Sequence, residues 1–411
     1  MIPTCHRRDP IPTCHRRDFL RHGALAATAA WWPAVGRAQA PASDKKVAAV
    51  VTCYYRYSHA DNIVTRFMEG YSIVGKSYPP PCRVASLYID QYPETDIGRP
   101  LAKRWNVPVV PTIADALTLG TGRLAVDGVL LIAEQGDYPV NERGQILYPR
   151  RKFFEEIVRV FRDSGRSVPV FVDKHLSYSW ENARWMYEQS KELGFAMMAG
   201  SSVPVSWRRP DLRPPLGVAW EDAVANGYGH FEVYGFHTLE GLQVMLERRP
   251  GGETGVRAVQ CLEGREAWEA AAAGRWSQAL LEAAQGQCPT TREGKVEEVD
   301  HDGIVYLIEY RDGLKAAAFI SPRRCREFAF AGKIKGQAQP AACWYELPKP
   351  QRDHFSFLVQ HIAQMILTGK PAYPVERTLL TTGMLAALVE SKATKHRRIE
   401  TPHLDVRYQL A

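Results

Sequence analysis

Short apolar runs alternate with amphipathic stretches from Val47 to about Gly200. This alternation is typical of βαβ units, in which helices cover a sheet of parallel strands. The runs predicted to be strands are VAAVV (47–51), RVASLYI (83–89), VPVV (107–110), VDGVLLIA (126–133), VPVFV (168–172) and FAMMA (195–199). Residues 150–165 and 180–194 carry apolar side chains at helical spacing and are predicted to be helices that bury one face on the sheet.

The pattern changes in the second half of the chain. Residues 201–215 are rich in Pro and Arg and predict a loop that crosses into another domain. Residues 296–320 alternate with a period near two, and the dipeptides Asp302-Gly303 and Asp312-Gly313 favour turns. This region therefore predicts an antiparallel sheet, and the stretch 354–392 predicts closing helices.

The first 40 residues have the order of features that an export signal has. After the tandem repeat of IPTCHRRD come Arg16-Arg17, Phe19-Leu20, the weakly apolar GALAATAAWW and the small-x-small triplet Ala38-Gln39-Ala40. This order resembles a twin-arginine signal and predicts a periplasmic or otherwise exported protein that meets the twin-arginine export machinery. A flexible basic tail is the alternative. The remainder is long enough for two domains, which we place at 45–200 and 201–411.

Composition narrows the classes of partner. The formal charge of +7 falls to +3 once residues 1–40, with six Arg and two Asp, are set aside, so nucleic acid is not expected as a partner. No apolar run is long enough for a transmembrane helix. The six cysteines after residue 40 include no C-x-x-C pair, which gives zinc-finger and thioredoxin chemistry no support and leaves disulfide pairing unassigned.

Two places carry residues suited to chemistry. Lys174 follows a predicted buried strand, and the carboxyl ends of parallel strands form the edge at which open α/β sheets bind ligands. An ion pair between Lys174 and Asp173 or another carboxylate is the structural alternative. The stretch 227–242 concentrates His230, Glu232, His237 and Glu240. These could ligate a divalent cation, but no H-x-x-x-H pair is present and no metal ligand is predicted.

Four stretches together resemble the Gfo/Idh/MocA oxidoreductases. They are 101–117, which is similar to the segment around the family's third strand; 172–176 (VDKHL), similar to its E-K-P-L motif; 227–237 (GYGHFEVYGFH), similar to G-G-G-x-L-x-D-x-G-x-H; and 355–391, similar to its closing helices. The resemblance implies a Rossmann-like parallel sheet followed by an α/β domain with an open antiparallel sheet. It also implies catalytic roles for Lys174 and His237, and a homo-oligomer through the open sheet.

The resemblance further implies NAD or NADP as cofactor. The positions that would bind it are Thr52, Cys53, Arg56, Asp90 and Lys174. The family's three loop glycines, which allow backbone to approach the pyrophosphate, are replaced by Val51, Cys53 and Arg56. The motif Asp is replaced by Val233, which removes the usual carboxylate partner of the histidine.

These features predict an exported NAD(P)-dependent oxidoreductase that acts on a sugar, cyclitol or derivative. Two alternatives stay open. The first is a catalytically silent Rossmann-like protein that binds a carbohydrate or a protein partner, which the loss of the glycines suggests. The second is an NAD- or metal-dependent carbohydrate hydrolase or lyase.

Overall fold

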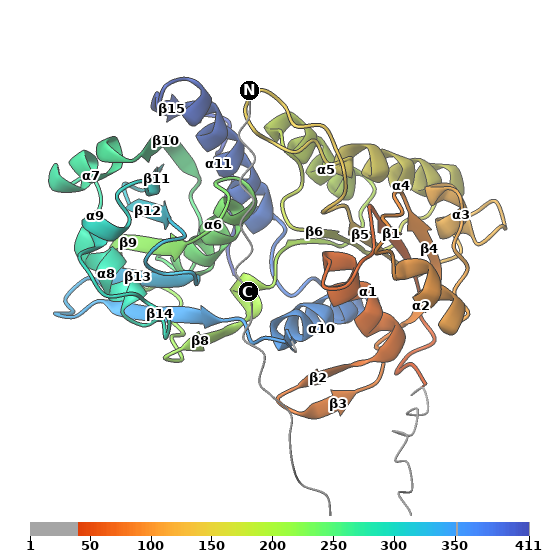
Figure 1. Cartoon of the computed structure of the whole chain (residues 1–411). Helices are drawn as coiled ribbons and strands as arrows, with labels where there is room; N and C mark the ends of the chain where they lie inside the picture. Colours follow the sequence, from red (N-terminus) through yellow and green to blue (C-terminus); the bar gives the residue numbers. More distant parts are fainter. Residues whose placement is uncertain (1–39, 351, 411) are drawn as a thin grey trace, which may run out of the picture. The chain divides into compact units, whose positions relative to one another are not determined.

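A computed structural model describes residues 40–350 and 352–410, so the predicted signal lies almost wholly outside the described residues. The described chain forms a five-stranded parallel sheet and an eight-stranded mixed sheet, with helices packed on both (Figure 1). The predicted fold class is therefore confirmed. None of the described helices is long and apolar enough to cross a membrane.

The first sheet contains the predicted parallel strands. In spatial order they are β4 (Arg83–Ile89), β1 (Lys46–Val51), β5 (Gly128–Ile132), β6 (Val170–Asp173) and β7 (Met197–Gly200). The predicted strand at 107–110 is reduced to one bridge between Val109 and Leu87 at the outer side of β4. The chain winds outward from β1 first through β4 and then through β5, so the topological switch point lies beside β1.

Helices cover both faces of this sheet. The helices α1 (His59–Glu69) and α10 (Asp353–Thr368) pack on one face. The opposite face holds α3 (Ile113–Thr118), α4 (Arg150–Ser164) and α5 (Trp180–Glu192). Two of these, α4 and α5, are the helices predicted at 150–165 and 180–194. Because α10 comes from the last quarter of the chain, residues far apart in sequence share the core of the first sheet.

Smaller elements lie at the ends of this half. They are the hairpin of β2 (Tyr71–Ile73) and β3 (Lys76–Tyr78), and the helix α2 (Gly98–Arg104). The boundaries predicted for the two domains, 45–200 and 201–411, stay predictions.

The second sheet is mostly antiparallel. Its strands stand in the order β15 (Ile399–Glu400), β10 (Val256–Glu263), β11 (Ile304–Tyr310), β12 (Lys315–Ile320), β9 (Trp220–Gly227), β13 (Ala329–Ile334), β14 (Ala341–Glu346) and β8 (Trp207–Arg209). Only the pair β9 and β12 is parallel among them. The predicted hairpin within 296–320 is β11 and β12, preceded by the short helix α9 (Val296–Val299). The predicted loop 201–215 also holds the 3₁₀ turn η1 (Val203–Val205) and β8.

Both faces of the second sheet are buried. Tyr306 and Ile308 of β11 pack toward α6 (Val233–Leu246) and α11 (Glu376–Ala393). Val305 and Leu307 of the same strand pack toward α7 (Arg265–Ala272) and α8 (Gln278–Gln285). The face that we expected to be open for homo-oligomerisation is therefore covered by helices of the same chain.

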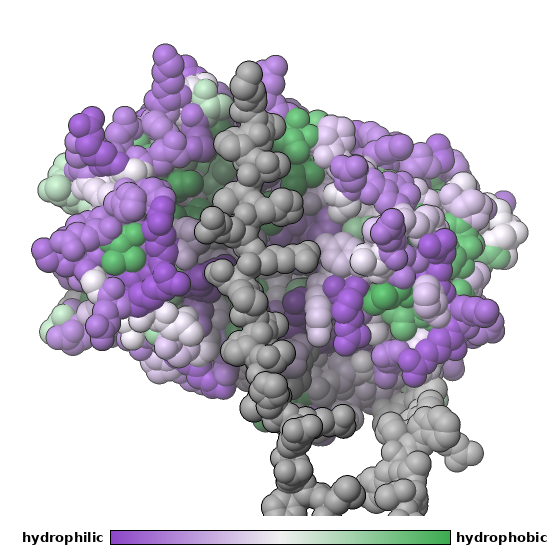
Figure 2. All heavy atoms as spheres, in the orientation of Figure 1, coloured by the Kyte–Doolittle hydropathy of each residue, from purple (hydrophilic) through white to green (hydrophobic). Residues whose placement is uncertain are grey.

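Hydrophilic residues dominate the face shown in Figure 2, and its hydrophobic areas are small and separate. All six cysteines of the described part are buried and free, so no disulfide joins them.

Candidate functional site

A cavity of about 650 Å³ lies beside the carboxyl ends of the parallel strands. The parallel-sheet half contributes His59, Glu134 and Lys174 to its lining. Helix α6 contributes Tyr234 and His237. The cavity is thus at the edge where open α/β sheets bind ligands, and it brings together Lys174 and His237, the two residues predicted to be catalytic. Their roles stay predictions.

Lys174 follows β6 directly and is held in a fixed position. Its backbone has a left-handed φ of 62°, and its N–H and C=O both bond to Gly200. A non-glycine residue in this conformation stores strain, which is common at functional sites. Its ammonium nitrogen lies 2.9 Å from Oε1 of Glu134. The structural alternative raised by the sequence is thus met, because Lys174 pairs with a carboxylate other than Asp173 at the end of a strand.

Glu134 is the centre of a buried charge cluster. It pairs with Lys174 and with the fully buried Arg150, whose Nη1 lies 3.3 Å from Nε2 of His175. Burial alone would raise the pKa of Glu134, but Lys174 and Arg150 hold it well below its ordinary range. The cluster therefore keeps a carboxylate ionised next to the cavity and fixes the Lys174 ammonium there.

A second acid–base pair stands next to Lys174. His59 is the first residue of α1, and its Nδ1 lies 2.7 Å from Oδ2 of Asp173, the fully buried last residue of β6. The ring of His59 also meets Phe355 edge-on, with centroids 5.4 Å apart. The two atoms are close enough to interact, although the hydrogen bond between them is not well aligned. An imidazole with a carboxyl group beside one nitrogen can offer its other nitrogen to a substrate, as a histidine general base does.

Two other histidines at the cavity are neutral at neutral pH. Burial, followed by the nearby Lys174, lowers the pKa of His237 well below its ordinary value. Burial lowers the pKa of His354 to about 3. Both rings can therefore exchange hydrogen bonds with a bound molecule without carrying charge.

The residues of 227–242 that could ligate a cation do not form a cluster of metal-ligand spacing in the described part of the chain. His230 is exposed, while Glu232 and Glu240 are buried. Burial raises the pKa of each of these two carboxyl groups to about 7, and Glu240 accepts a hydrogen bond from the backbone of Ser201. Within residues 40–350 and 352–410, the cluster with metal-ligand spacing is a different one, Cys288, Cys325 and Glu327.

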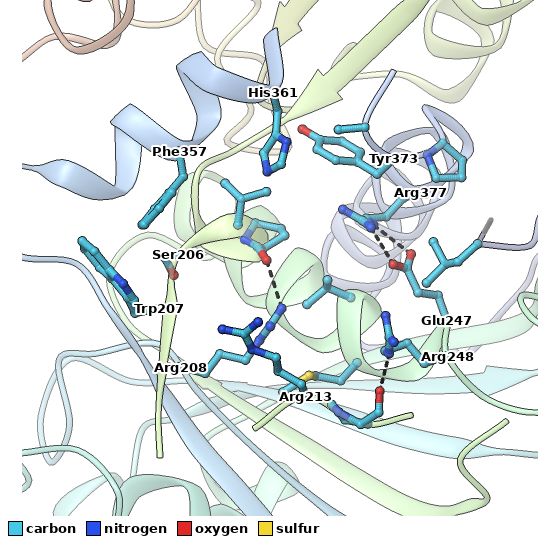
Figure 3. A pocket seen from close by; sticks show the side chains of 18 of the residues that line it. Ser206, Trp207, Arg208, Arg213, Glu247, Arg248, Phe357, His361, Tyr373 and Arg377 are labelled. Atoms are coloured by element: carbon cyan, nitrogen blue, oxygen red, sulfur yellow. Dashed lines mark hydrogen bonds and ion pairs between the residues drawn. The ribbon is translucent and has the colours of Figure 1, made fainter. Parts of the chain in front are cut away.

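A second cavity, of about 760 Å³, lies between α10, η1 and the start of α11 (Figure 3). Its arginines are committed to the protein itself. Arg377 pairs with Glu247, Arg208 donates to the carbonyl of Pro204, and Arg248 donates to that of Pro214. These bonds stabilise the fold. The described lining of this cavity does not contain acid–base pairs like those of the 650 Å³ cavity.

Comparison with known proteins identifies the fold. Neither a protein-family model nor a curated protein matches this chain. Solved structures do match: GenD2 from gentamicin A biosynthesis, in complex with NAD, is 15% identical and has a TM-score of 0.54 over 89% of this chain and 99% of its own. A Gfo/Idh/MocA family oxidoreductase from Vibrio cholerae is 14% identical, with a TM-score of 0.53 over 86% and 99%. The myo-inositol dehydrogenase from Lactobacillus casei, in complex with NAD(H) and myo-inositol, is 12% identical, with a TM-score of 0.52 over 87% and 97%.

The chain has the Gfo/Idh/MocA fold. The resemblance drawn from the sequence is confirmed at this level, and neighbours with this fold bind NAD(H). Whether this chain can do so depends on its own residues at the switch point.

The loop after β1 does not fit a pyrophosphate. In the dinucleotide-binding arrangement, a helix N-terminus directly follows the first strand and offers free N–H groups. Here Thr52–Ser58 separate the strand from α1. Several N–H groups near the helix start already have acceptors in the chain: Tyr57 donates to Asp61 Oδ2, His59 to Gln135 Oε1 and Asp61 to Ser58 Oγ. These N–H groups are therefore not free to bond a phosphate.

The predicted cofactor-binding residues have other partners. The hydroxyl of the buried Thr52 donates to the carbonyl of Glu134, and Cys53 is buried. Arg56 is exposed and lies over the ring of Tyr57. Asp90, the expected ribose ligand, accepts hydrogen bonds from the hydroxyls of Tyr88 and Tyr138.

A pair of hydrogen bonds also links the two sides of the crevice. Gln91, after β4, donates to the carbonyl of Asp137 and accepts from its N–H, after β5. Together with the contact from Tyr138 to Asp90, these bonds close the path that a dinucleotide would follow. The residues present on this Gfo/Idh/MocA fold therefore do not fit NAD or NADP.

Sequence reasoning missed three functional candidates: His59, Glu134 and Asp173. Each lies at or just beyond the carboxyl end of a parallel strand, or at the start of the helix that follows β1. Applying the strand-end rule to every polar residue at this edge, and not only to Lys174, would have found Glu134 and Asp173.

Proposed function

We propose that this protein is a proton-transfer enzyme of the lyase or isomerase type that acts on a sugar, a cyclitol or one of their acid derivatives, without a dinucleotide. One observation carries the proposal: His59, which contacts Asp173 behind it, and the Lys174–Glu134 pair line the same cavity, while the dinucleotide crevice is closed by the chain's own side chains. The fold supports the substrate class, because one neighbour binds myo-inositol.

His59 is the proposed general base. Its Nδ1 contacts Asp173, which leaves Nε2 to take a proton from a carbon or hydroxyl of the substrate. The Lys174 ammonium would stabilise the negative charge that develops on the adjacent substrate oxygen, since Glu134 holds it at the cavity wall. Neutral His237 would orient a hydroxyl group by hydrogen bonding.

The lining of the cavity suits a polyhydroxylated ring. Tyr228, Tyr234 and Phe328 offer aromatic faces for the C–H face of the ring. Arg326 and Arg352 line the same cavity and offer donors for hydroxyl or carboxylate oxygens.

The test is solvent exchange at carbon. The protein is incubated in D2O with a panel of uronic acids, aldonic acids, keto sugars and inososes, and proton NMR follows the replacement of C–H by C–D. We expect exchange with at least one compound, and a loss of about 100-fold or more in His59→Gln and Asp173→Asn, because a positioned base contributes about that much.

The matched control is His361→Gln, since His361 borders the other cavity. This variant should exchange as the unaltered protein does. Absence of exchange across the panel, or equal loss in the control, contradicts the proposal.

A second candidate is the NAD(P)-dependent oxidoreductase. It is favoured by the fold and by the shared cavity of Lys174 and His237. Acid denaturation of the purified protein, followed by assay of the supernatant for nicotinamide dinucleotide, separates the two. One equivalent released would establish the second candidate, whereas none released and none bound on titration supports the first.

We also propose that the protein is exported by the twin-arginine route. Support comes from the sequence of residues 1–40 alone. Replacing Arg16 and Arg17 by Lys should keep the protein in the cytoplasm, and fractionation of cells that express both forms measures this.

A further inference from the structure

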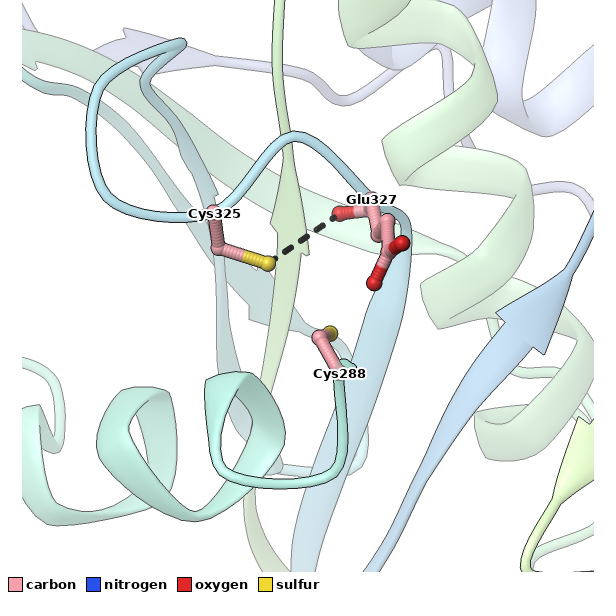
Figure 4. Close-up of side chains that lie close together, drawn as sticks. All are labelled: Cys288, Cys325 and Glu327. Atoms are coloured by element: carbon pink, nitrogen blue, oxygen red, sulfur yellow. Dashed lines mark hydrogen bonds between the residues drawn. The ribbon is translucent and has the colours of Figure 1, made fainter. Parts of the chain in front are cut away.

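Two buried thiols and a carboxyl group meet in the second half of the chain (Figure 4). Cys288 follows α8, Cys325 lies between β12 and β13, and Glu327 comes two residues later. Their ligand atoms all lie within 4.8 Å of one another. Cys288 and Cys325 have 7% and 0% of their surface exposed.

This geometry is close to that of a zinc-class metal site. In a tetrahedral site with Zn–S bonds of about 2.3 Å and Zn–O bonds of about 2.0 Å, ligand atoms stand roughly 3.5–3.8 Å apart. Contraction of the cluster by about 1 Å would suffice to reach this spacing. The three ligands come from two loops, the one after α8 and the one between β12 and β13.

The carboxyl group of Glu327 supports a cation. Its Oε2 is buried and accepts no hydrogen bond of regular geometry from the described residues, although Thr290 and Cys288 lie within interaction range of the carboxyl group. Glu327 also borders the cavity that holds His59 and Lys174. A buried oxygen without a partner costs free energy unless a cation or proton satisfies it.

We propose that Cys288, Cys325 and Glu327 bind one zinc-class divalent cation at the edge of this cavity. The two Sγ atoms and one carboxylate oxygen form three bonds to the metal, both thiols lose their protons to solvent, and water from the cavity takes the fourth position. Three protein ligands and one water is the pattern of a zinc site that stays open to small molecules. The inference concerns binding only and holds whatever reaction the cavity performs.

The test uses Co2+ in place of Zn2+. The whole protein is reduced with a phosphine, freed of metal by a chelator and titrated anaerobically with CoCl2. We expect one equivalent to produce a near-ultraviolet thiolate-to-cobalt charge-transfer band and visible bands of tetrahedral cobalt, and ZnCl2 to abolish both. Binding should release two protons, which a weakly buffered solution with a pH indicator measures.

Variants assign the ligands. Cys288→Ser and Cys325→Ser should each weaken or abolish the charge-transfer band, while Cys343→Ser, which alters an equally buried thiol elsewhere in the core, should keep it. Glu327→Gln keeps both thiols and should weaken Co2+ binding at least about 10-fold. If a serine variant does not fold, Glu327→Gln still tests the site.

Several results would overturn the proposal. They are a reduced, folded protein without a charge-transfer band, equal loss of the band in Cys343→Ser, and unchanged affinity in Glu327→Gln. A Cys288–Cys325 disulfide in the protein as purified, detected by mass spectrometry of unreduced peptides, would show that the two thiols form a redox pair instead.

Discussion

Glu240→Gln should make the protein less sensitive to alkaline pH. Glu240 is buried in α6, and burial raises the pKa of its carboxyl group to about 7. Its Oε2 accepts a hydrogen bond from the N–H of Ser201 at 2.8 Å. The charge of Arg377 lowers the pKa of Glu240, whereas that of Asp173 raises it. Glutamine keeps an oxygen for Ser201 and cannot ionise, so the substitution removes the titration while it preserves the hydrogen bond.

The sign and size of this effect follow from the pKa of Glu240 in the folded protein and in the unfolded chain. The unfolded chain has an ordinary Glu pKa of about 4.3, so between about pH 4.3 and 7 the folded state binds a proton that the unfolded state has lost. The free energy of unfolding therefore falls as pH rises through this window. From pH 5 to pH 8 the loss amounts to about 2.5 kcal/mol. With an unfolding entropy of roughly 2 cal/mol/K per residue, this corresponds to about 3 °C in Tm for a body of this size.

The assay compares Tm at pH 5 and pH 8 for the unaltered protein, Glu240→Gln and the control Glu282→Gln, which alters an exposed carboxylate on α8. The difference in Tm between Glu240→Gln and the unaltered protein should be about 3 °C larger at pH 8 than at pH 5. The control should track the unaltered protein at both values. An equal difference at both pH values would refute the reasoning, because it would mean that Glu240 ionises in the folded state as it does in the unfolded chain.

Two further substitutions test the cluster around Glu134 and the covered sheet. Glu134→Gln leaves Lys174 and Arg150 without their carboxylate and should lower the free energy of unfolding by about 3–5 kcal/mol at pH 7, measured by urea denaturation. Because the pKa of Glu134 is lowered on folding, this contribution is fully present above the ordinary Glu pKa and declines as pH falls from there towards the lowered pKa of the folded state. A gap that stays constant down to pH 3 would contradict the assignment. Gly303→Ala places a Cβ in steric conflict with the ring of Phe319 and should cost about 1–3 kcal/mol, seen as a lower Tm; an unchanged Tm would show that the turn moves freely.

The fold could be predicted largely because it rests on local patterns. Five of the six predicted runs are strands of the parallel sheet, since a strand buried on both faces must be apolar throughout. The prediction of a strand at 107–110 was wrong. This run lies at the edge of the sheet beside β4, where Val109 forms a single bridge with Leu87. The sequence did not predict that helices cover the second face of the eight-stranded sheet. The helices α7 and α8 are short, and nothing in their sequences shows which face of the sheet they pack on.

The site was harder to predict because its partners are distant in sequence. Lys174 was found from its place after a strand, but Glu134 is 40 residues earlier and His59 more than 100. The cysteine cluster shows the same limit: 37 residues separate Cys288 from Cys325, so no short metal-binding motif could reveal it. The absence of the family's three loop glycines, by contrast, was visible in the sequence, and Asp61 and Gln91 make hydrogen bonds within the chain at this end of the sheet.

Asp173 connects the stability of the fold to the proposed chemistry. It is fully buried, and neither of its oxygens accepts a well-aligned hydrogen bond, although His59 Nδ1 lies only 2.7 Å away. A buried carboxyl group in this state costs free energy that an amide or an apolar residue at the end of β6 would avoid. A fold under selection for stability alone has no physical reason to keep it. Its place behind His59, in a chain whose phosphate-binding loop has been replaced, is what a proton-transfer site requires, because the imidazole must be oriented and its positive charge stabilised when the proton arrives.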